Sequence, residues 1–384
     1  MLELLSASPE FTLTRADAPI RVKKKTRTKQ KDKRAVATFH KEQADYHLSY
    51  EIGEFISKYT MNFDHDEIRF FNTRSSDKVI LNTPSKTRAI VNLERINNYR
   101  KINRFFEDVN CLLQNNDLFI SSVETHTVRK NRILKKVPSL LRGVYYTLDF
   151  VCHRICPKLN HVKKLYFKLT RGYNRVLTKA EAFGRLYACG FEMVDDMVID
   201  GRLFFVARKR ADPSYDSKPT YGPLISLKRV GKNGKIINVF KVRTMHPYAE
   251  YLQQYLYNRN SLKTGGKIKS DFRISRFGRL FRKYWIDELP MLINFIKGEM
   301  KFIGVRPLSE HYFSLYPKEL QQKRTQVKPG LFPPFYVDMP ETLDEIIKSE
   351  EKYLDLYMKN PIMTDMVYFF KIIVNIVFKG NRSA

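Results

Sequence analysis

The segment LISLKRVGKNGKIINVFKVRTM (224–245) carries a clear fold signal. Two runs typical of strands, 224–230 and 235–242, flank the sequence Gly-Lys-Asn-Gly, and Asn-Gly between alternating runs is a strong signal for a β-hairpin. Lys241 and Arg243 are two residues apart on the second run, so both are expected to project from one face. Two such cations form either a solvated face or part of an anion site, and their spacing does not decide between the two.

The segment DFRISRFGRLFRKYWIDELPMLINFIKGEMKFIGVRP (271–307) follows. Arginine recurs every three residues from Arg273 to Arg282 and alternates with phenylalanine, which predicts a basic stripe backed by an aromatic one. Such a stripe is often a solvated surface. This one leads into two adjacent carboxylates, Asp287 and Glu288, which favours a functional interpretation.

The sequence Asp287-Glu288-Leu289-Pro290 predicts the start of a helix that continues through Ile296 and stops at Gly298. Aspartate is a good N-cap, glutamate is favoured in the first turn, and proline is tolerated there. One interpretation of Asp287 is therefore that it only caps this helix.

The other interpretation is that Asp287 is a nucleophile. An aspartate with an ordinary pKa of about 3.9 is ionised at neutral pH, and a helix N-terminus stabilises the anion further. Nearby arginines would offset the repulsion between this carboxylate and a phosphate, so that it could attack phosphorus. Arg306, which precedes Pro307, adds a guanidinium suited to bidentate phosphate binding.

Composition excludes several classes of protein. The 384 residues are 43% hydrophobic, enough for a core and for two domains, so disorder of most of the chain is excluded. The formal net charge of +29 predicts a polyanionic partner, which could be nucleic acid, an anionic membrane or a phosphorylated substrate. Four cysteines without a Cys-x-x-Cys pair predict reduced thiols in a cytosolic compartment. We expect no signal peptide and no membrane-spanning helix, which would need about 20 apolar residues.

The chain is predicted to be organised in four parts. Residues 1–36 are rich in Lys and Arg and predict a disordered tail, which is either merely solvated or an electrostatic tether. Residues 37–208 have the mixed pattern of an α/β domain, and 209–221 are a polar linker rich in Pro, Ser and Asp. Residues 222–384 form a second domain, so the fold class is α/β (mixed α+β).

Local signals in the first domain indicate its elements. Apolar residues at helical spacing predict a helix at 95–114, and 118–120 reads as a buried strand. Thr178 and Glu181 form a capping box that opens a helix, which is followed by a hairpin turning at Asp200-Gly201. This order faintly resembles the end of the class I methyltransferase fold, without an active-site motif.

Six motifs of the second domain occur in one order that resembles the bacterial sugar transferases, the monotopic polyprenyl-phosphate phosphoglycosyl transferases. They are RVGKNGK (229–235), FKVRTM (240–245), IDELP (286–290), KGEM (297–300), GVRP (304–307) and KPG (328–330). The resemblance covers roughly 221–380 and implies a catalytic domain with a β-hairpin and helices. It implies transfer of a sugar 1-phosphate from a UDP-sugar to a polyprenyl phosphate with release of UMP, at the start of exopolysaccharide, capsule or glycan repeat-unit synthesis.

The resemblance also implies roles for individual residues. Asp287 matches the nucleophile that forms a covalent aspartyl-phosphosugar intermediate, and Glu288 matches its partner beside a Mg²⁺ ion. The basic positions around the phosphates are matched by Lys241, Arg243, Arg282 and Arg306. The expected location is cytoplasmic and peripheral on the inner face of the cell membrane.

One departure concerns the membrane. Where the family places a re-entrant membrane helix, this sequence has the polar linker 209–221. An anionic membrane surface would then be bound by the basic tail, by LLRGVYYTLDFVCHRI (140–155) or by MVYFFKIIVNIVF (366–378). The last of these either lies in the interface or packs against the catalytic domain.

Two other functions remain open at this level. One is a non-catalytic scaffold derived from a sugar transferase, which would bind partner enzymes through 37–210. The other, disfavoured because no nucleic-acid motif is present, is a nucleic-acid-binding protein. The sequence leaves open which sugar is used and whether a protein partner or a homo-oligomer forms.

Overall fold

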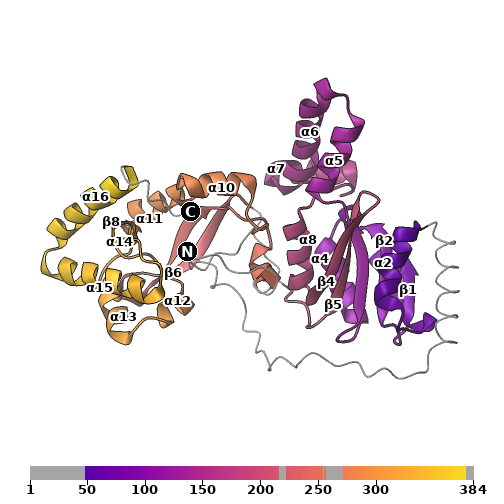
Figure 1. Cartoon of the computed structure of the whole chain (residues 1–384), viewed down its shortest axis with the longest axis horizontal. Coiled ribbons are helices and arrows are strands. Elements are labelled where there is room, and N and C mark those ends of the chain that lie inside the picture. Colours follow the sequence, from indigo (N-terminus) through magenta and orange to yellow (C-terminus); the bar gives the residue numbers. More distant parts are fainter. Residues whose placement is uncertain (1–47, 216–221, 254, 257–270, 378–384) are drawn as a thin grey trace. The chain divides into compact units, whose positions relative to one another are not determined.

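The computed structural model describes residues 48–215, 222–253, 255–256 and 271–377. These residues divide into two compact units (Figure 1). Unit 1 comprises the described residues of 222–246 and of 253–377, and unit 2 comprises 48–215 together with Pro247–Leu252. The predicted tail 1–36 and part of the predicted linker lie outside the described residues, and the domain boundaries stay predictions.

Unit 2 is built on a five-stranded sheet in the order β1-β2-β3-β5-β4. The strands are β1 (Ile68–Phe71), β2 (Ala89–Arg95), β3 (Leu118–Val123), β4 (Phe191–Ile199) and β5 (Arg202–Lys209). β1, β2 and β3 pair in parallel, whereas β5 runs antiparallel between β3 and β4. This combination of helices, parallel strands and an antiparallel hairpin is consistent with the predicted α/β class. The likeness to methyltransferases stays a prediction.

Helices cover both faces of this sheet (Figure 1). α2 (Tyr50–Thr60) packs on the face to which Leu118 and Ile120 point. The opposite face carries α4 (Ile102–Leu112) and α8 (Lys179–Ala188), and there Phe119 contacts Phe105 and Phe106 of α4 edge to face. Because successive strand residues point to opposite faces, both layers of the core are specified by the same strands.

The remaining elements of unit 2 surround this sandwich. They are η2 (His65–Glu67), α3 (Ser76–Leu81), η3 (Ile96–Asn98), α5 (His126–Lys136), η4 (Ser139–Leu141), α6 (Arg142–Phe150), η5 (Val151–Ile155), η6 (Cys156–Lys158), α7 (Asn160–Thr170) and η8 (Ala249–Leu252). Figure 1 shows α5, α6 and α7 grouped beyond one end of the sheet.

Most local predictions for unit 2 are confirmed. β3 contains the predicted strand, Thr178 accepts a hydrogen bond from the Glu181 backbone, and the hairpin turns through Asp200 and Gly201, both at positive φ. The helix predicted at 95–114 begins only at Ile102. The cause is Asn97, whose buried side chain hydrogen-bonds the backbone of Glu124 at 2.9 and 2.7 Å and so holds this segment out of the helix.

Unit 1 contains the predicted hairpin, β6 (Leu224–Val230) and β7 (Ile236–Val242), which pair in antiparallel register. Its other elements are η7 (Lys232–Gly234), α10 (Arg276–Lys283), η9 (Ile286–Met291), α11 (Leu292–Ile296), β8 (Lys301–Ile303), α12 (Glu310–Ser314), α13 (Lys318–Thr325), β9 (Gly330–Phe332), α14 (Phe335–Asp338), α15 (Leu343–Lys359) and α16 (Pro361–Val377). β8 and β9 pair in parallel.

The C-terminal helix α16 has two different faces. Tyr368 and Ile372 are buried in a core cluster with Tyr353 of α15, so one face packs within unit 1. Phe370 and Met366 on the other face are more than half exposed. One face of this helix therefore packs within unit 1, and a membrane contact of its exposed face stays a prediction. Within the described ranges, no helix combines the length and the apolar character needed to cross a bilayer.

Two glycines bring β8 and β9 together. A Cβ atom on Gly330 would lie 2.1 Å from the Gly304 backbone nitrogen, and one on Gly304 would lie 2.9 Å from the Gly330 nitrogen. Only glycine permits this approach. It sets the position of the chain that runs from β8 into Arg306.

We expect Gly330→Ala to destabilise the protein by about 1–3 kcal/mol, as overpacked sites do. The added methyl group must push the β8 backbone away. Thermal unfolding of the full chain measures this loss. Gly222→Ala is the matched control in the same unit, because its nearest new contact is at 3.7 Å. Equal thermal unfolding midpoints for the two variants would contradict the close approach of Gly304 and Gly330.

Candidate active site

Lys241 lies on the inward face of β7. This strand alternates in burial, and Lys241 continues the row of Ile237 and Val239, which pack against Met291 and other core residues. The Lys241 side chain is 9% exposed, and its Nζ atom lies 3.0 Å from Oε1 of Glu288. A buried ammonium group requires such a partner.

The two carboxylates lie on η9, and the predicted helix start is partly wrong. Trp285, not Asp287, is the residue before the first turn, and its backbone is left-handed with φ 53°. Asp287 therefore lies within the first turn of η9 and is not the N-cap residue of this helix. The cause is tertiary: Trp285 Nε1 donates to the Tyr336 hydroxyl at 2.8 Å, which holds the chain in this bend.

Asn294 of α11 ties η9 and α11 to the hairpin. Its side chain is fully buried, its Oδ1 accepts from the Phe240 backbone at 3.1 Å, and its Nδ2 donates to the Asn238 carbonyl at 2.7 Å. Nδ2 also lies 2.6 Å from a carboxylate oxygen of Glu299. These bonds fix the register between β7 and η9, so Lys241 stays opposite Glu288.

A small pocket, open to solvent, lies beside this ion pair. Its charged lining consists of Arg229, Lys241 and Arg306 with the single carboxylate of Glu288. Three cations against one anion make the pocket suited to a ligand that carries several negative charges. Leu331, Pro333 and Tyr336 supply part of the less polar wall.

Arg306 reaches the pocket from the segment after β8. Its backbone carbonyl accepts a hydrogen bond from Arg324, and Arg324 forms a buried ion pair with Glu350 of α15. Burial lowers the pKa of Arg324 to about 10, so this guanidinium still carries its charge at neutral pH. The Arg306 backbone is thus held by a paired, buried cation.

Asp287 is half-buried at the same end of η9. Burial, and then repulsion by Glu288, raise the pKa of Asp287 above its ordinary value, while Lys241 and Arg282 act in the opposite direction. The side chain of Arg282 is oriented by a hydrogen bond from Nε to the Thr244 hydroxyl at 2.9 Å. A carboxylate with a raised pKa is, once ionised, a stronger nucleophile than an ordinary one.

The structure thus brings together Lys241, Glu288 and Arg306, with Asp287 and Arg282 beside them. Arg243 is placed differently: its Nε donates to the Gly222 carbonyl at 3.0 Å, and it does not line the pocket. The predicted arginine stripe is also split. Arg273 is buried and paired with Asp271 at 2.7 Å, while Arg276 and Arg279 are exposed on α10.

Arg229 and Tyr336 line the pocket but were not among the predicted site residues. Arg229 is 7% exposed, and its pairing partner in the hairpin is Ile237, a core residue of β7. Its presence in RVGKNGK, one of the six motifs that carry the family resemblance, was a usable signal. Tyr336 gave no comparable signal.

A divalent cation would have to rely on few protein ligands. In the described part of the chain, no three His, Cys, Asp or Glu side chains gather closely enough to form a metal site. Mg²⁺ needs only one or two carboxylates when substrate phosphates supply other ligands. The adjacent carboxylates of Asp287 and Glu288, the latter in the pocket wall, fit that requirement.

Comparison with known proteins gives a consistent result for unit 1. Residues 216–379 match the family model described as bacterial sugar transferase. The galactosyl transferase CpsE of Streptococcus agalactiae serotype III (strain NEM316) is 35% identical over 140 residues, which are 35% of this chain and 31% of CpsE. The uncharacterized sugar transferase EpsL of Bacillus subtilis (strain 168) is 39% identical over 103 residues, 27% of this chain and 45% of EpsL.

A third relative is named for its acceptor. The undecaprenyl-phosphate galactose phosphotransferase of Salmonella typhimurium (strain LT2) is 32% identical over 158 residues, 39% of this chain and 32% of that protein. The chain therefore spans less than half the length of each of these three relatives.

The raised pKa of Asp287 predicts an effect on stability. Because the folded state resists ionisation of this carboxyl, the protein is less stable above the folded pKa than below the unfolded value of 3.8. We expect the neutral variant Asp287→Asn to raise the melting temperature at neutral pH. The gain should shrink as the pH falls and the wild-type carboxyl becomes protonated.

Thermal unfolding measured from neutral to acidic pH tests this expectation. Glu341→Gln, at an exposed position before α15, is the control and should show no comparable gain. A melting temperature lowered by Asp287→Asn at neutral pH would contradict the unfavourable environment of this carboxylate.

Proposed function

We propose that this chain, whose residues 216–379 match the bacterial sugar transferase family model, transfers a sugar 1-phosphate from a UDP-sugar to a polyprenyl phosphate and releases UMP. This reaction would begin the synthesis of an exopolysaccharide, capsule or glycan repeat unit. The observation that carries the proposal is the pair Asp287 and Glu288 beside a pocket whose other charged groups are cations. The names of the relatives, one of them an undecaprenyl-phosphate galactose phosphotransferase, support it.

The charges suit phosphoryl transfer. A diphosphate entering the pocket would meet Arg229, Lys241 and Arg306, which offset its charge and reduce its repulsion of the Asp287 carboxylate. Lys241 is already paired with Glu288, so it is held at the pocket wall before the ligand binds. The Lys241 side chain then needs little rearrangement when the diphosphate binds.

In the proposed reaction an Asp287 oxygen attacks the phosphorus that bears the sugar. The bond from this phosphorus to the oxygen bridging it to UMP breaks, and UMP leaves with that electron pair. A phosphate oxygen of the polyprenyl phosphate then attacks the same phosphorus, and the Asp287 carboxylate leaves. All the reacting oxygens are ionised, so neither step requires a proton transfer.

Mg²⁺ is the proposed cofactor. Glu288, with Asp287 beside it, would hold the ion together with oxygens of the substrate phosphates. When bound, it would supply positive charge that stabilises the transferred phosphoryl group and the departing UMP.

The proposed location is cytoplasmic and peripheral, on the inner face of the cell membrane, where a polyprenyl phosphate presents its headgroup. Unit 1 exposes apolar side chains that such a surface would accept. Ile296 of α11 is 83% exposed, and Phe370 of α16 is 59% exposed. Exposed apolar patches of this kind mark contacts with membranes or with other proteins.

Release of UMP tests the proposal. The purified chain is incubated with radiolabelled UDP-sugars, Mg²⁺ and undecaprenyl phosphate, and UMP and labelled lipid are measured. We expect activity in the wild type and in Glu341→Gln, and a loss of about a thousandfold or more in Asp287→Asn, the order seen when a nucleophile is removed. A folded wild type that releases no UMP with any sugar would instead favour the non-catalytic scaffold.

Arg229 offers a second test, since the structure adds it to the pocket. We expect Arg229→Met to raise KM for the UDP-sugar about tenfold or more, because a hydrogen bond to a charged group contributes about 1.5–3 kcal/mol. Arg276→Met, on the exposed face of α10, is the control. An unchanged KM in Arg229→Met would remove Arg229 from donor binding.

A further inference from the structure

A helical arm of unit 2, residues 139–170, turns its apolar side chains outward. It comprises η4, α6, η5, η6 and α7, and it lies outside the residues that match the family model. Leu140 is 90% exposed and Leu169 is 74% exposed, values unusual for leucine in a folded domain. Figure 1 shows α6 and α7 beyond the end of the sheet, away from its core.

The exposed apolar residues form a stripe on each helix. On α6 and the end of η4 just before it they are Leu141, Val144 and Leu148, and on α7 they are Val162, Leu165 and Leu169. Spacings of three and four residues place each set on one helical face. In a soluble domain such an apolar face normally packs on a core. Here the apolar stripe of α6 and that of α7 are both exposed to solvent.

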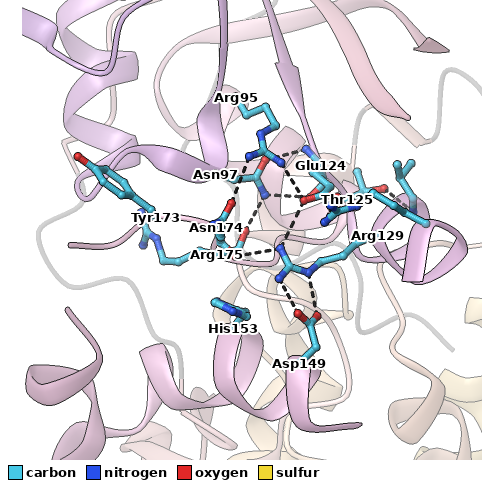
Figure 2. A network of polar contacts seen from close by, with 12 residues as sticks. Arg95, Asn97, Glu124, Thr125, Arg129, Asp149, His153, Tyr173, Asn174 and Arg175 are labelled. Carbon is cyan, nitrogen blue, oxygen red and sulfur yellow. Dashed lines mark hydrogen bonds and ion pairs between the residues drawn. The ribbon is translucent and has the colours of Figure 1, made fainter. Parts of the chain in front are cut away.

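Polar contacts fix the orientation of the arm. Asp149 of α6 accepts two hydrogen bonds from Arg129 of α5, at 2.6 and 2.8 Å, and Arg129 also lies 3.4 Å from Glu124 at the end of β3 (Figure 2). The Asp149 and Arg129 side chains are 11% and 8% exposed. A buried pair of this kind is strongly directional.

A second buried cluster holds the middle of the arm, η5 and η6. Arg154 of η5 pairs with Glu181 of α8 and donates to the Val176 carbonyl at 3.0 Å. Lys158 of η6 lies 3.0 Å from Glu181 as well. The arm therefore directs Asp149, Arg154 and Lys158 inward into ion pairs, while its apolar side chains face outward.

The charge around the stripe is positive. Between Lys135 and Arg171 the sequence contains a single carboxylate, Asp149, and that one pairs with Arg129. Exposed basic side chains in the same range are Lys135, Lys136, Arg142, Lys163, Lys164, Lys168 and Arg171. Apolar residues flanked by lysine and arginine are typical of helices that lie in the interface of an anionic bilayer.

We propose that this arm docks unit 2 onto an anionic bilayer surface, with the leucine stripe in the interface and the lysines on the lipid headgroups. α6 and α7 have 9 and 11 residues, so they lie along the surface rather than cross it. Aliphatic side chains favour hydrocarbon over a nucleic-acid backbone, which offers no apolar surface to them. The inference deepens the proposed function, since the proposed acceptor is a lipid, but the binding does not depend on catalysis.

Vesicle sedimentation with the full chain tests the docking. Vesicles of phosphatidylcholine with phosphatidylglycerol should bind the wild type, and vesicles of phosphatidylcholine alone should bind it weakly. We expect the double variant Leu148→Ser with Leu165→Ser to lower binding about tenfold or more, and Lys163→Gln with Lys164→Gln to lower it for anionic vesicles. Leu81→Ser and Lys78→Gln, at exposed positions of α3, are the matched controls and should bind as the wild type does.

A fluorescent label locates the contact. In a chain whose native cysteines are replaced, an environment-sensitive fluorophore on Leu148→Cys should shift to shorter wavelength with anionic vesicles, and one on Leu81→Cys should not. No vesicle binding, equal binding by the leucine variants, or an unshifted arm label would each overturn the proposal. A fluorescence shift that occurs without lipid and grows with protein concentration would assign the stripe to self-association instead. RNA binding by the wild type that is lost in the lysine variants would assign the arm to nucleic acid.

The two proposals fail separately. If UMP is not released but the arm label shifts with vesicles, the docking stands and the enzymatic function falls. If the leucine variants release UMP with detergent-solubilised acceptor but lose vesicle binding, both stand. If the wild type releases UMP and the arm label never shifts, only the docking is overturned.

Discussion

The ion pair between Lys241 and Glu288 joins the two parts of unit 1 that carry the proposed reactive groups. It connects the hairpin to η9, and its 3.0 Å separation depends on the register that Asn294 fixes between them. A buried ammonium without this carboxylate would be costly, and the carboxylate without the ammonium would repel both Asp287 and a phosphate. The pair thus holds a cation at the pocket wall and leaves Asp287 as the carboxyl with the raised pKa.

Charge and burial are used differently in the two units. Unit 1 places the cations of the proposed site at a pocket, where the Arg229 side chain donates to the Lys228 carbonyl and the Arg306 backbone accepts from Arg324. Unit 2 buries its ion pairs at the base of the helical arm and exposes leucines on the arm's outer faces. Each arrangement is built from paired charges, because unpaired ones could not be buried.

The sequence predicts those features whose causes are local. Asn-Gly specifies the hairpin turn, strand alternation places Lys241 on the inward face, and Thr178 caps its helix through its own side chain. Features with distant causes were missed or misplaced. The position of Asp287 depends on Trp285, whose bend is held by Tyr336, and the late start of α4 depends on Asn97 binding the backbone at Glu124. The different orientation of Arg243 depends on the Gly222 carbonyl, which strand spacing does not reveal.

Trapping the covalent intermediate tests the central claim most directly. The chain is incubated with a panel of UDP-sugars and Mg²⁺ but without lipid acceptor, then quenched, digested and examined by mass spectrometry. The account predicts that the peptide containing Asp287 gains the mass of one sugar phosphate, that an equal amount of UMP appears, and that Asp287→Asn gains nothing. An adduct on another residue, or UMP release with no adduct at Asp287, would contradict it.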